Sequence, residues 1–159
     1  MKNKSYFPMF VDLSDKNVVI VGGGNIATRR VKTMLQFTRN VKVIAPKMTE
    51  ELLELGRTSY AEVDVRPVKR SDFSCAYMVI AATNDRKLND EIYRVCKEEG
   101  IYVNIADDRE KCDFQFPGIF KQDELVVGLM TNGLDAKMAR KVHVALEEAL
   151  TNTDFTGEE

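Results

Sequence analysis

Asn17-Val-Val-Ile-Val-Gly-Gly-Gly-Asn-Ile-Ala-Thr-Arg-Arg30 is the stretch that decides the fold. Residues 18–21 form a short apolar run rich in β-branched side chains, which predicts a buried strand, and the apolar residues that follow recur at helical spacing. Gly22 and Gly24 occupy the first two glycine positions of the pattern G-x-G-x-x-G/A, and Ala27 occupies the third. The stretch therefore predicts a strand, a tight turn and a helix, in that order.

The glycine turn predicts a dinucleotide-binding site. Glycine lets the backbone turn tightly and approach a pyrophosphate, and the N-terminus of the following helix offers free N–H groups and a partial positive charge. We therefore expect Gly22, Gly23 and Gly24 to hold a bound NAD. A tight strand-to-helix turn that binds no ligand is the alternative.

The composition is ordinary for a soluble globular protein. The chain has 159 residues, enough for one domain with a real core or for one domain plus a small appendage, and 44% of them are hydrophobic and 30% charged. A net charge of −2 favours neither nucleic-acid nor membrane binding, and no apolar run approaches the length of a membrane span. The three cysteines lie too far apart for a metal or redox motif, so we expect no resident metal. Pro8 and Asp12 interrupt any signal-peptide core, and we expect a cytoplasmic protein.

Strand and helix patterns alternate through the first two thirds of the chain. Short links join them, which predicts βαβ units and an α/β fold with a Rossmann-like, doubly wound parallel sheet. The alternation of apolar and polar residues at 61–65 favours an edge position for that strand. The other expected strands are 18–21, 41–45, 77–82 and 101–105, and the helices between strands end near residues 38, 56 and 100.

The pattern changes after residue 106. Residues 114–120 and 125–130 read as two strands of a hairpin, and a helix is expected over about 135–150. We therefore divide the chain into an NAD-binding Rossmann-like domain (1–112) and a hairpin–helix extension (113–159). A hairpin with so little of its own domain to cover it often pairs with another subunit, so we expect a homodimer that uses this extension.

Ligands of an open parallel sheet bind beyond the carboxyl ends of its strands. Pro46 and Lys47 follow one expected strand, Thr83 and Asn84 follow another, and Asn104 lies near the end of the last. Thr83 and Asn84 can donate hydrogen bonds to a nicotinamide ribose or cap the next helix. The ribose-binding acid expected about 20 residues after the glycines is missing, so either backbone groups hold the adenosine or Lys47 favours a 2′-phosphate.

Asp107 and Asp108 directly follow the last expected strand of the sheet. Two carboxylates at this edge can supply a general base, or they can form the turn that opens the loop. On the final helix, Arg140 and its neighbouring lysines are most simply a solvated face, and binding of a substrate's carboxylates is the alternative. His143, the one histidine, fits a surface position better than a catalytic one.

Five segments add up to a family pattern. Their order and spacing resemble the precorrin-2 dehydrogenase/sirohydrochlorin ferrochelatase family, which includes the N-terminal half of siroheme synthases, and the resemblance extends over about residues 6–150. The segments are Val-Gly-Gly-Gly-Asn-Ile-Ala-Thr-Arg-Arg (21–30), Val-Ile-Ala-Pro (43–46), Ile-Ala-Ala-Thr-Asn-Asp (80–85), Val-Asn-Ile-Ala-Asp-Asp (103–108) and Cys-Asp-Phe-Gln-Phe-Pro (112–117).

The resemblance implies NAD-dependent oxidation of precorrin-2 to sirohydrochlorin, often followed by insertion of Fe²⁺ as a second substrate. It also implies a dimer interlocked through the hairpin region. Asp107 matches the family's key aspartate, which is assigned to both steps. Asn25 and Ile26 match cofactor contacts after the glycine turn, and Pro46 and Lys47 match those after the second strand.

The sequence departs from the family before its last helix. Where relatives have Ser/Thr-x-Gly-x-Ser-Pro, this chain has Thr131-Asn-Gly-Leu-Asp-Ala136 and then ends at Glu159. We expect Asp108, Thr131 and Arg140 to meet the substrate. Two alternatives remain: a nucleotide- or tetrapyrrole-binding module without catalysis, and a dehydrogenase for a small anionic substrate.

Overall fold

The computed structural model describes residues 6–58, 60–131 and 136–151. The chain forms two compact units, one from Val11 to Gln115 and one that combines the residues up to Phe10 with those from Phe116 onward. The boundary expected at residue 112 placed the N-terminal residues with the sheet, whereas the structure groups residues 6–10 with the C-terminal unit. Residues 6–10 form neither strand nor helix, so they add nothing to the sheet.

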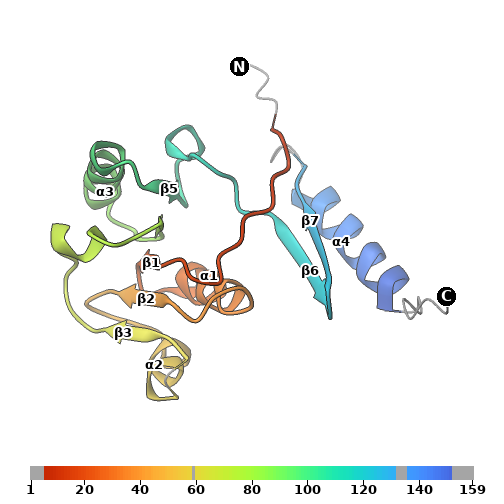
Figure 1. Cartoon of the computed structure of the whole chain (residues 1–159), viewed down its shortest axis with the longest axis horizontal. Coiled ribbons are helices and arrows are strands. Elements are labelled where there is room, and N and C mark those ends of the chain that lie inside the picture. Colours follow the sequence, from red (N-terminus) through yellow and green to blue (C-terminus); the bar gives the residue numbers. More distant parts are fainter. Residues whose placement is uncertain (1–5, 59, 132–135, 152–159) are drawn as a thin grey trace. The chain divides into compact units, whose positions relative to one another are not determined.

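The first unit is built on a parallel sheet of five strands (Figure 1). Every neighbouring pair is parallel, and Val18 lies between Val41 and Met78 in the register. The strands follow the order β3-β2-β1-β4-β5, which confirms the predicted Rossmann-like sheet and its edge strand. They are β1 (Val18–Val21), β2 (Val41–Ile44), β3 (Glu62–Asp64), β4 (Met78–Ala81) and β5 (Tyr102–Ile105).

Three helices connect these strands: α1 (Asn25–Met34), α2 (Glu50–Arg57) and α3 (Arg86–Glu99). Local sequence sets their ends. The Asp85 side chain accepts hydrogen bonds from two N–H groups at the start of α3, and Gly100, with φ +69°, ends it in the left-handed conformation. Helix α1 ends four residues before the expected Thr38, because its last residues tighten into turns such as Phe37 N–H to Met34 O.

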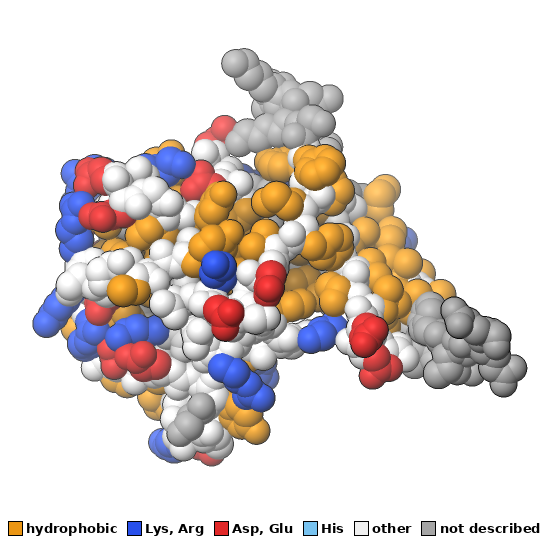
Figure 2. Space-filling model, viewed as in Figure 1, with side chains coloured by type: hydrophobic (Ala, Val, Ile, Leu, Met, Phe, Trp, Pro, Cys, Tyr) orange, Lys and Arg blue, Asp and Glu red, His pale blue; other side chains and the backbone are white. Residues whose placement is uncertain are grey.

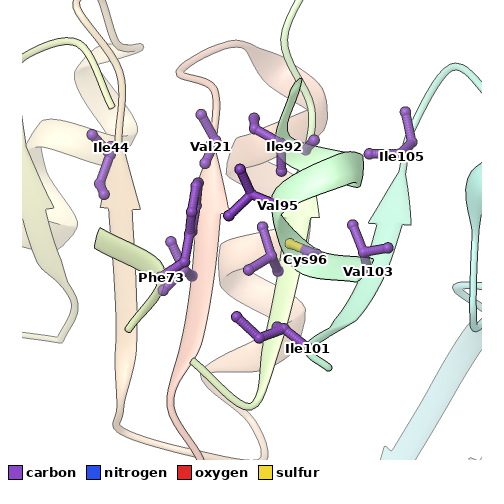
Figure 3. Packing of buried hydrophobic residues seen from close by; sticks show 12 residues of the cluster. Val21, Ile44, Phe73, Ile92, Val95, Cys96, Ile101, Val103 and Ile105 are labelled. Carbon is purple, nitrogen blue, oxygen red and sulfur yellow. The ribbon is translucent and has the colours of Figure 1, made fainter. Parts of the chain in front are cut away.

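The core on the α3 face of the sheet is a continuous apolar cluster (Figure 3). Alternate residues of the strands point into it, which is the two-residue period of a strand. A short 3₁₀ helix, η1 (Arg70–Phe73), also contributes its buried Phe73, and the sequence patterns did not predict this element. The labelled members are Val21, Ile44, Phe73, Ile92, Val95, Cys96, Ile101, Val103 and Ile105.

The second unit consists of an antiparallel hairpin and a helix, together with residues 6–10. Strands β6 (Gly118–Gln122) and β7 (Leu125–Leu129) pair as expected, and α4 (Ala136–Thr151) packs against β6. The turn is shorter than expected, since it needs only two residues; Asp123 adopts φ +50°, which aspartate tolerates. No helix within the described residues is long and apolar enough to cross a membrane.

Candidate functional site

Two of the three glycines are required by the protein's own packing. Gly22 has φ +128°, and a Cβ placed on it would lie 2.3 Å from the carbonyl oxygen of Ala82. A Cβ on Gly23 would lie 1.9 Å from the carbonyl oxygen of Lys47. Real Cβ atoms do not approach backbone this closely, so any side chain at either position would force two loops apart. The glycine turn is thus packed between the loops that follow β4 and β2.

Gly24 differs, because within the described residues no heavy atom beyond its neighbours along the chain lies within 4 Å of a Cβ placed there. It is the N-cap of α1, so its lack of a side chain leaves this helix start without a side-chain hydrogen bond. The first turn of α1 carries no acidic residue, while Asn25 is exposed and Ile26 is 48% exposed. Free N–H groups, a partial positive charge and open space together fit a pyrophosphate. The turn can therefore hold the predicted dinucleotide.

The loop after β2 is tied to the glycine turn. Thr49 donates its N–H to the carbonyl of Gly23 at 2.9 Å, and its hydroxyl lies 2.9 Å from that of Thr28 on α1. Pro46 and Lys47 are exposed at the end of β2, beside the turn. Their predicted contacts with the cofactor stay predictions, as does the choice between a ribose and a 2′-phosphate at Lys47.

Thr83 and Asn84 begin the loop between β4 and α3. Asp85 caps the helix, and the Thr83 hydroxyl bonds within the protein, to the backbone of Asp85 and to the side chain of Asn89. Asn84 is exposed. The structure therefore gives Thr83 an internal partner, and cofactor binding by either residue remains a prediction.

Asp107 lies just beyond β5, and its side chain is 39% exposed. Its Oδ1 accepts a hydrogen bond of 3.0 Å from Nδ2 of Asn89, a side chain of α3 that is only 1% exposed. Its Oδ2 lies 3.8 Å from Nε of the exposed Arg86. A partly exposed carboxylate, held on one oxygen by a buried amide and approached on the other by an exposed arginine, is suited to accept a proton from a bound molecule.

Asp108, although adjacent, has a different environment. Its side chain caps η2 (Arg109–Lys111) by accepting the N–H of Glu110, and it pairs with Lys111 at 3.2 Å. The hydrogen bond from Lys111 lowers the pKa of Asp108 below its usual value. This is the turn-forming role that the sequence left open, and a contact between Asp108 and substrate remains a prediction.

The turn that carries Asp107 is closed by Cys112. Its thiol lies 3.3 Å from the carbonyl oxygen of Ile105 and 3.2 Å from that of Asp108, and it accepts the N–H of Ile105. Asn104 is buried in β5 and donates Nδ2 to the carbonyl of Phe114 at 2.9 Å. Asn104 thus connects β5 to the segment around Phe114. Its predicted contact with the cofactor stays a prediction.

The remaining predicted residues belong to the second unit. Thr131 follows β7, and Arg140 is exposed on α4. Most of the segment that departs from the family pattern, residues 132–135, lies outside the described residues. Binding of substrate by Thr131 and Arg140 stays a prediction.

This geometry agrees with comparisons to known proteins. Residues 9–118 match the model of a family described as "Putative NAD(P)-binding". The chain belongs to this NAD(P)-binding family. The family membership confirms the prediction of a nicotinamide dinucleotide as cofactor.

Relatives of the family extend the match. The chain is 42% identical over 149 residues to "Probable multifunctional siroheme biosynthesis protein HemA" of Ruminiclostridium josui, covering 93% of this chain and 29% of that protein. It is 33% identical over 142 residues to "Siroheme synthase" of Nitrosococcus oceani, covering 89% of this chain and 30% of that protein. The chain therefore spans about 30% of the length of these curated relatives.

One solved structure is matched over a larger share of its own length than these relatives are. "SirC, precorrin-2 dehydrogenase" superposes with a TM-score of 0.81 at 27% identity, covering 94% of this chain and 71% of that one. The resemblance to the precorrin-2 dehydrogenase module of siroheme synthases, drawn from the motifs, is confirmed.

Sequence reasoning missed Asn89. A polar residue stands there among Leu88, Ile92, Val95 and Cys96, which form the apolar face of α3. A buried amide needs hydrogen-bond partners, and this misfit in the apolar pattern was the available clue.

Proposed function

We propose that this chain is an NAD-dependent dehydrogenase that oxidises precorrin-2 to sirohydrochlorin. The observation that carries the proposal is the half-exposed carboxylate of Asp107, fixed by a buried amide at the same edge of the sheet as the glycine turn. The names of the related proteins, siroheme synthase and precorrin-2 dehydrogenase, support the choice of substrate.

The residues divide the work of the reaction between them. When bound, NAD⁺ supplies the acceptor for a hydride. The glycine turn and the start of α1 bind its pyrophosphate through backbone N–H groups, with Gly24 leaving room for it. Asp107 takes the proton that the substrate loses along with the hydride, through the oxygen that Asn89 does not occupy.

The test is an anaerobic reaction with enzymatically generated precorrin-2 and NAD⁺, followed by the appearance of sirohydrochlorin and NADH. We expect turnover by the wild type and a loss of about 100-fold or more in Asp107→Asn. The variant should bind NAD⁺ as the wild type does. NAD⁺ binding without turnover by the wild type would contradict the proposal and favour the non-catalytic binding module.

Iron insertion extends the proposal to a second substrate, Fe²⁺. Oδ2 of Asp107, the oxygen that Asn89 does not hold, can accept pyrrole protons as the metal enters sirohydrochlorin. Adding Fe²⁺ to the same reaction tests this step. Sirohaem formation faster than in a protein-free control, and slower in Asp107→Asn, is the expected result; a rate equal to the control would remove Fe²⁺ from the proposal.

The proposed macromolecular partner is a second copy of this chain. Large hydrophobic side chains are exposed in the second unit, including Phe7 at 87%, Met9, Phe10, Met138 and Val142. Figure 2 shows hydrophobic side chains gathered over the N-terminal segment and the hairpin, while charged side chains cover much of the first unit. Exposed apolar surface of this extent favours a protein interface. The cytoplasm is the proposed location.

A further inference from the structure

One buried amide connects the two loops that carry Thr83 and Asp107. Asn89 donates Nδ2 to Oδ1 of Asp107 at 3.0 Å and to the backbone carbonyl of Thr83 at 3.2 Å. Its Oδ1 lies 2.7 Å from the hydroxyl of Thr83. The loop after β4 and the loop after β5 are therefore held by the same side chain.

The orientation of this amide follows from its partners. A backbone carbonyl only accepts hydrogen bonds, so the nitrogen of Asn89 must face Thr83 O. The second N–H then points to Asp107, and the amide oxygen is left to accept the Thr83 hydroxyl. Since both N–H groups and the oxygen are used, Asn89 cannot flip without breaking the network.

Helix capping does not account for Asn89. The side chain of Asp85 already accepts the N–H groups of Lys87 and Leu88, so the start of α3 is capped without it. Burying a polar amide costs free energy unless its hydrogen bonds are made, and an apolar residue would continue the helix face. What the amide adds at this position is a link between the loop of Thr83 and the carboxylate of Asp107.

We propose that Asn89 is a positioning residue for Asp107, holding Oδ1 of the carboxylate so that Oδ2 faces the substrate in register with the loop of Thr83. This inference rests on the proposed role of Asp107 as base. Two charged side chains nearby do not do the same work: Arg86 is exposed and lies 3.8 Å from the other oxygen, Oδ2, and Lys111 is paired with Asp108 and Asp90.

The kinetic test compares two variants and a control. Asn89→Leu removes the donor, and misplacing a reacting group by about 1 Å costs about 100-fold, so we expect kcat to fall between about 10- and 100-fold with the KM for NAD⁺ within about twofold. Asn89→Asp also sets a second carboxylate against Asp107. We therefore expect Asn89→Asp to lose at least as much kcat as Asn89→Leu, again with little change in the KM for NAD⁺.

Ile92→Val is the matched control, because Ile92 is buried about one turn further along α3 and has no hydrogen-bonding group to offer Asp107. It should lose stability and keep the wild-type kcat. If a folded Asn89→Leu retains the wild-type kcat, the proposal is overturned.

A second readout does not depend on turnover. In the NMR spectrum of the wild type, the two Nδ2 protons of Asn89 should exchange slowly, and Asp107→Asn should shift one of them and speed its exchange. If Asp107→Asn changes neither the shift nor the exchange rate of these protons, the proposal is overturned. This measurement stands even if precorrin-2 is not oxidised, which would refute the proposed function alone.

Discussion

Identical residues in the glycine turn serve different physical purposes. Gly22 and Gly23 make room for neighbouring backbone, whereas Gly24 faces open space at the start of α1. The sequence pattern predicted the turn and its ligand, but it could not separate these purposes. The distinction depends on where the loops after β2 and β4 pass, which local sequence does not encode.

Gly24→Ala should separate cofactor binding from folding. Its φ of −89° suits alanine, so the free energy of unfolding should change by less than about 1 kcal/mol. The added methyl group enters the space for the pyrophosphate, and we expect NAD⁺ to bind about tenfold more weakly by calorimetry.

Gly23→Ala is the comparison for this experiment. Its Cβ would overlap the Lys47 carbonyl, so it should lose about 3 kcal/mol or more in urea unfolding. Equal stability of the two variants would contradict the assignment.

The paired acids were also ambiguous in sequence. The spacing placed Asp107 and Asp108 together at the sheet edge. In the structure Asp108 caps η2 and pairs with Lys111, whereas Asp107 is bound by Asn89 and its side chain stays 39% exposed. Asn89 was not predicted because its hydrogen bond to Asp107 joins residues that are 18 positions apart in the sequence.

At the scale of elements, period and capping predicted most of the first unit. Apolar runs indicated the five strands, and Gly100 indicated the end of α3. The 3₁₀ helix η1 was missed, since four residues are too few for a helical period. Its position depends on polar contacts instead: Arg66 donates two hydrogen bonds of 2.7 and 2.8 Å to Asp72.

Asp72→Asn should destabilise the protein in a pH-dependent way. The side chain is 8% exposed, and the hydrogen bonds from Arg66 lower the pKa of Asp72 to about 2 from 3.8. A carboxyl whose pKa is lowered by folding stabilises the fold above its unfolded pKa. We expect urea unfolding to give a loss of about 2 kcal/mol at pH 7.

The difference between wild type and Asp72→Asn should shrink as the pH falls from 4 toward 2, where the wild-type carboxyl becomes protonated. Ser71→Ala, on the same 3₁₀ helix, is the control and should show no such trend. A constant difference across this pH range would show that the ion pair is not its source.

At the scale of the whole molecule, the chain is a nucleotide-binding unit and a second unit of hairpin and helix. The order of the patterns predicted both. It did not predict that residues 6–10 group with the hairpin, because an extended segment has no period from which its partner can be inferred.

The exposed side of α4 offers a test of the proposed dimer. Met138 and Val142 are four residues apart and both exposed, so they share one side of the helix. We expect light scattering to give the wild type twice the mass of one chain, and the double variant Met138→Glu/Val142→Glu the mass of a monomer. Lys141→Glu, an exposed charge change on the same helix, should remain dimeric. A wild-type monomer would contradict the proposal.

Thr49 connects α2, the glycine turn and α1. It caps α2 with its side chain, donates its N–H to Gly23, and meets Thr28 of α1 through its hydroxyl. Unwinding the first turn of α2 therefore also releases the glycine turn. We therefore expect a dinucleotide bound at the glycine turn to slow the opening of α2 as well, although it need not contact this helix.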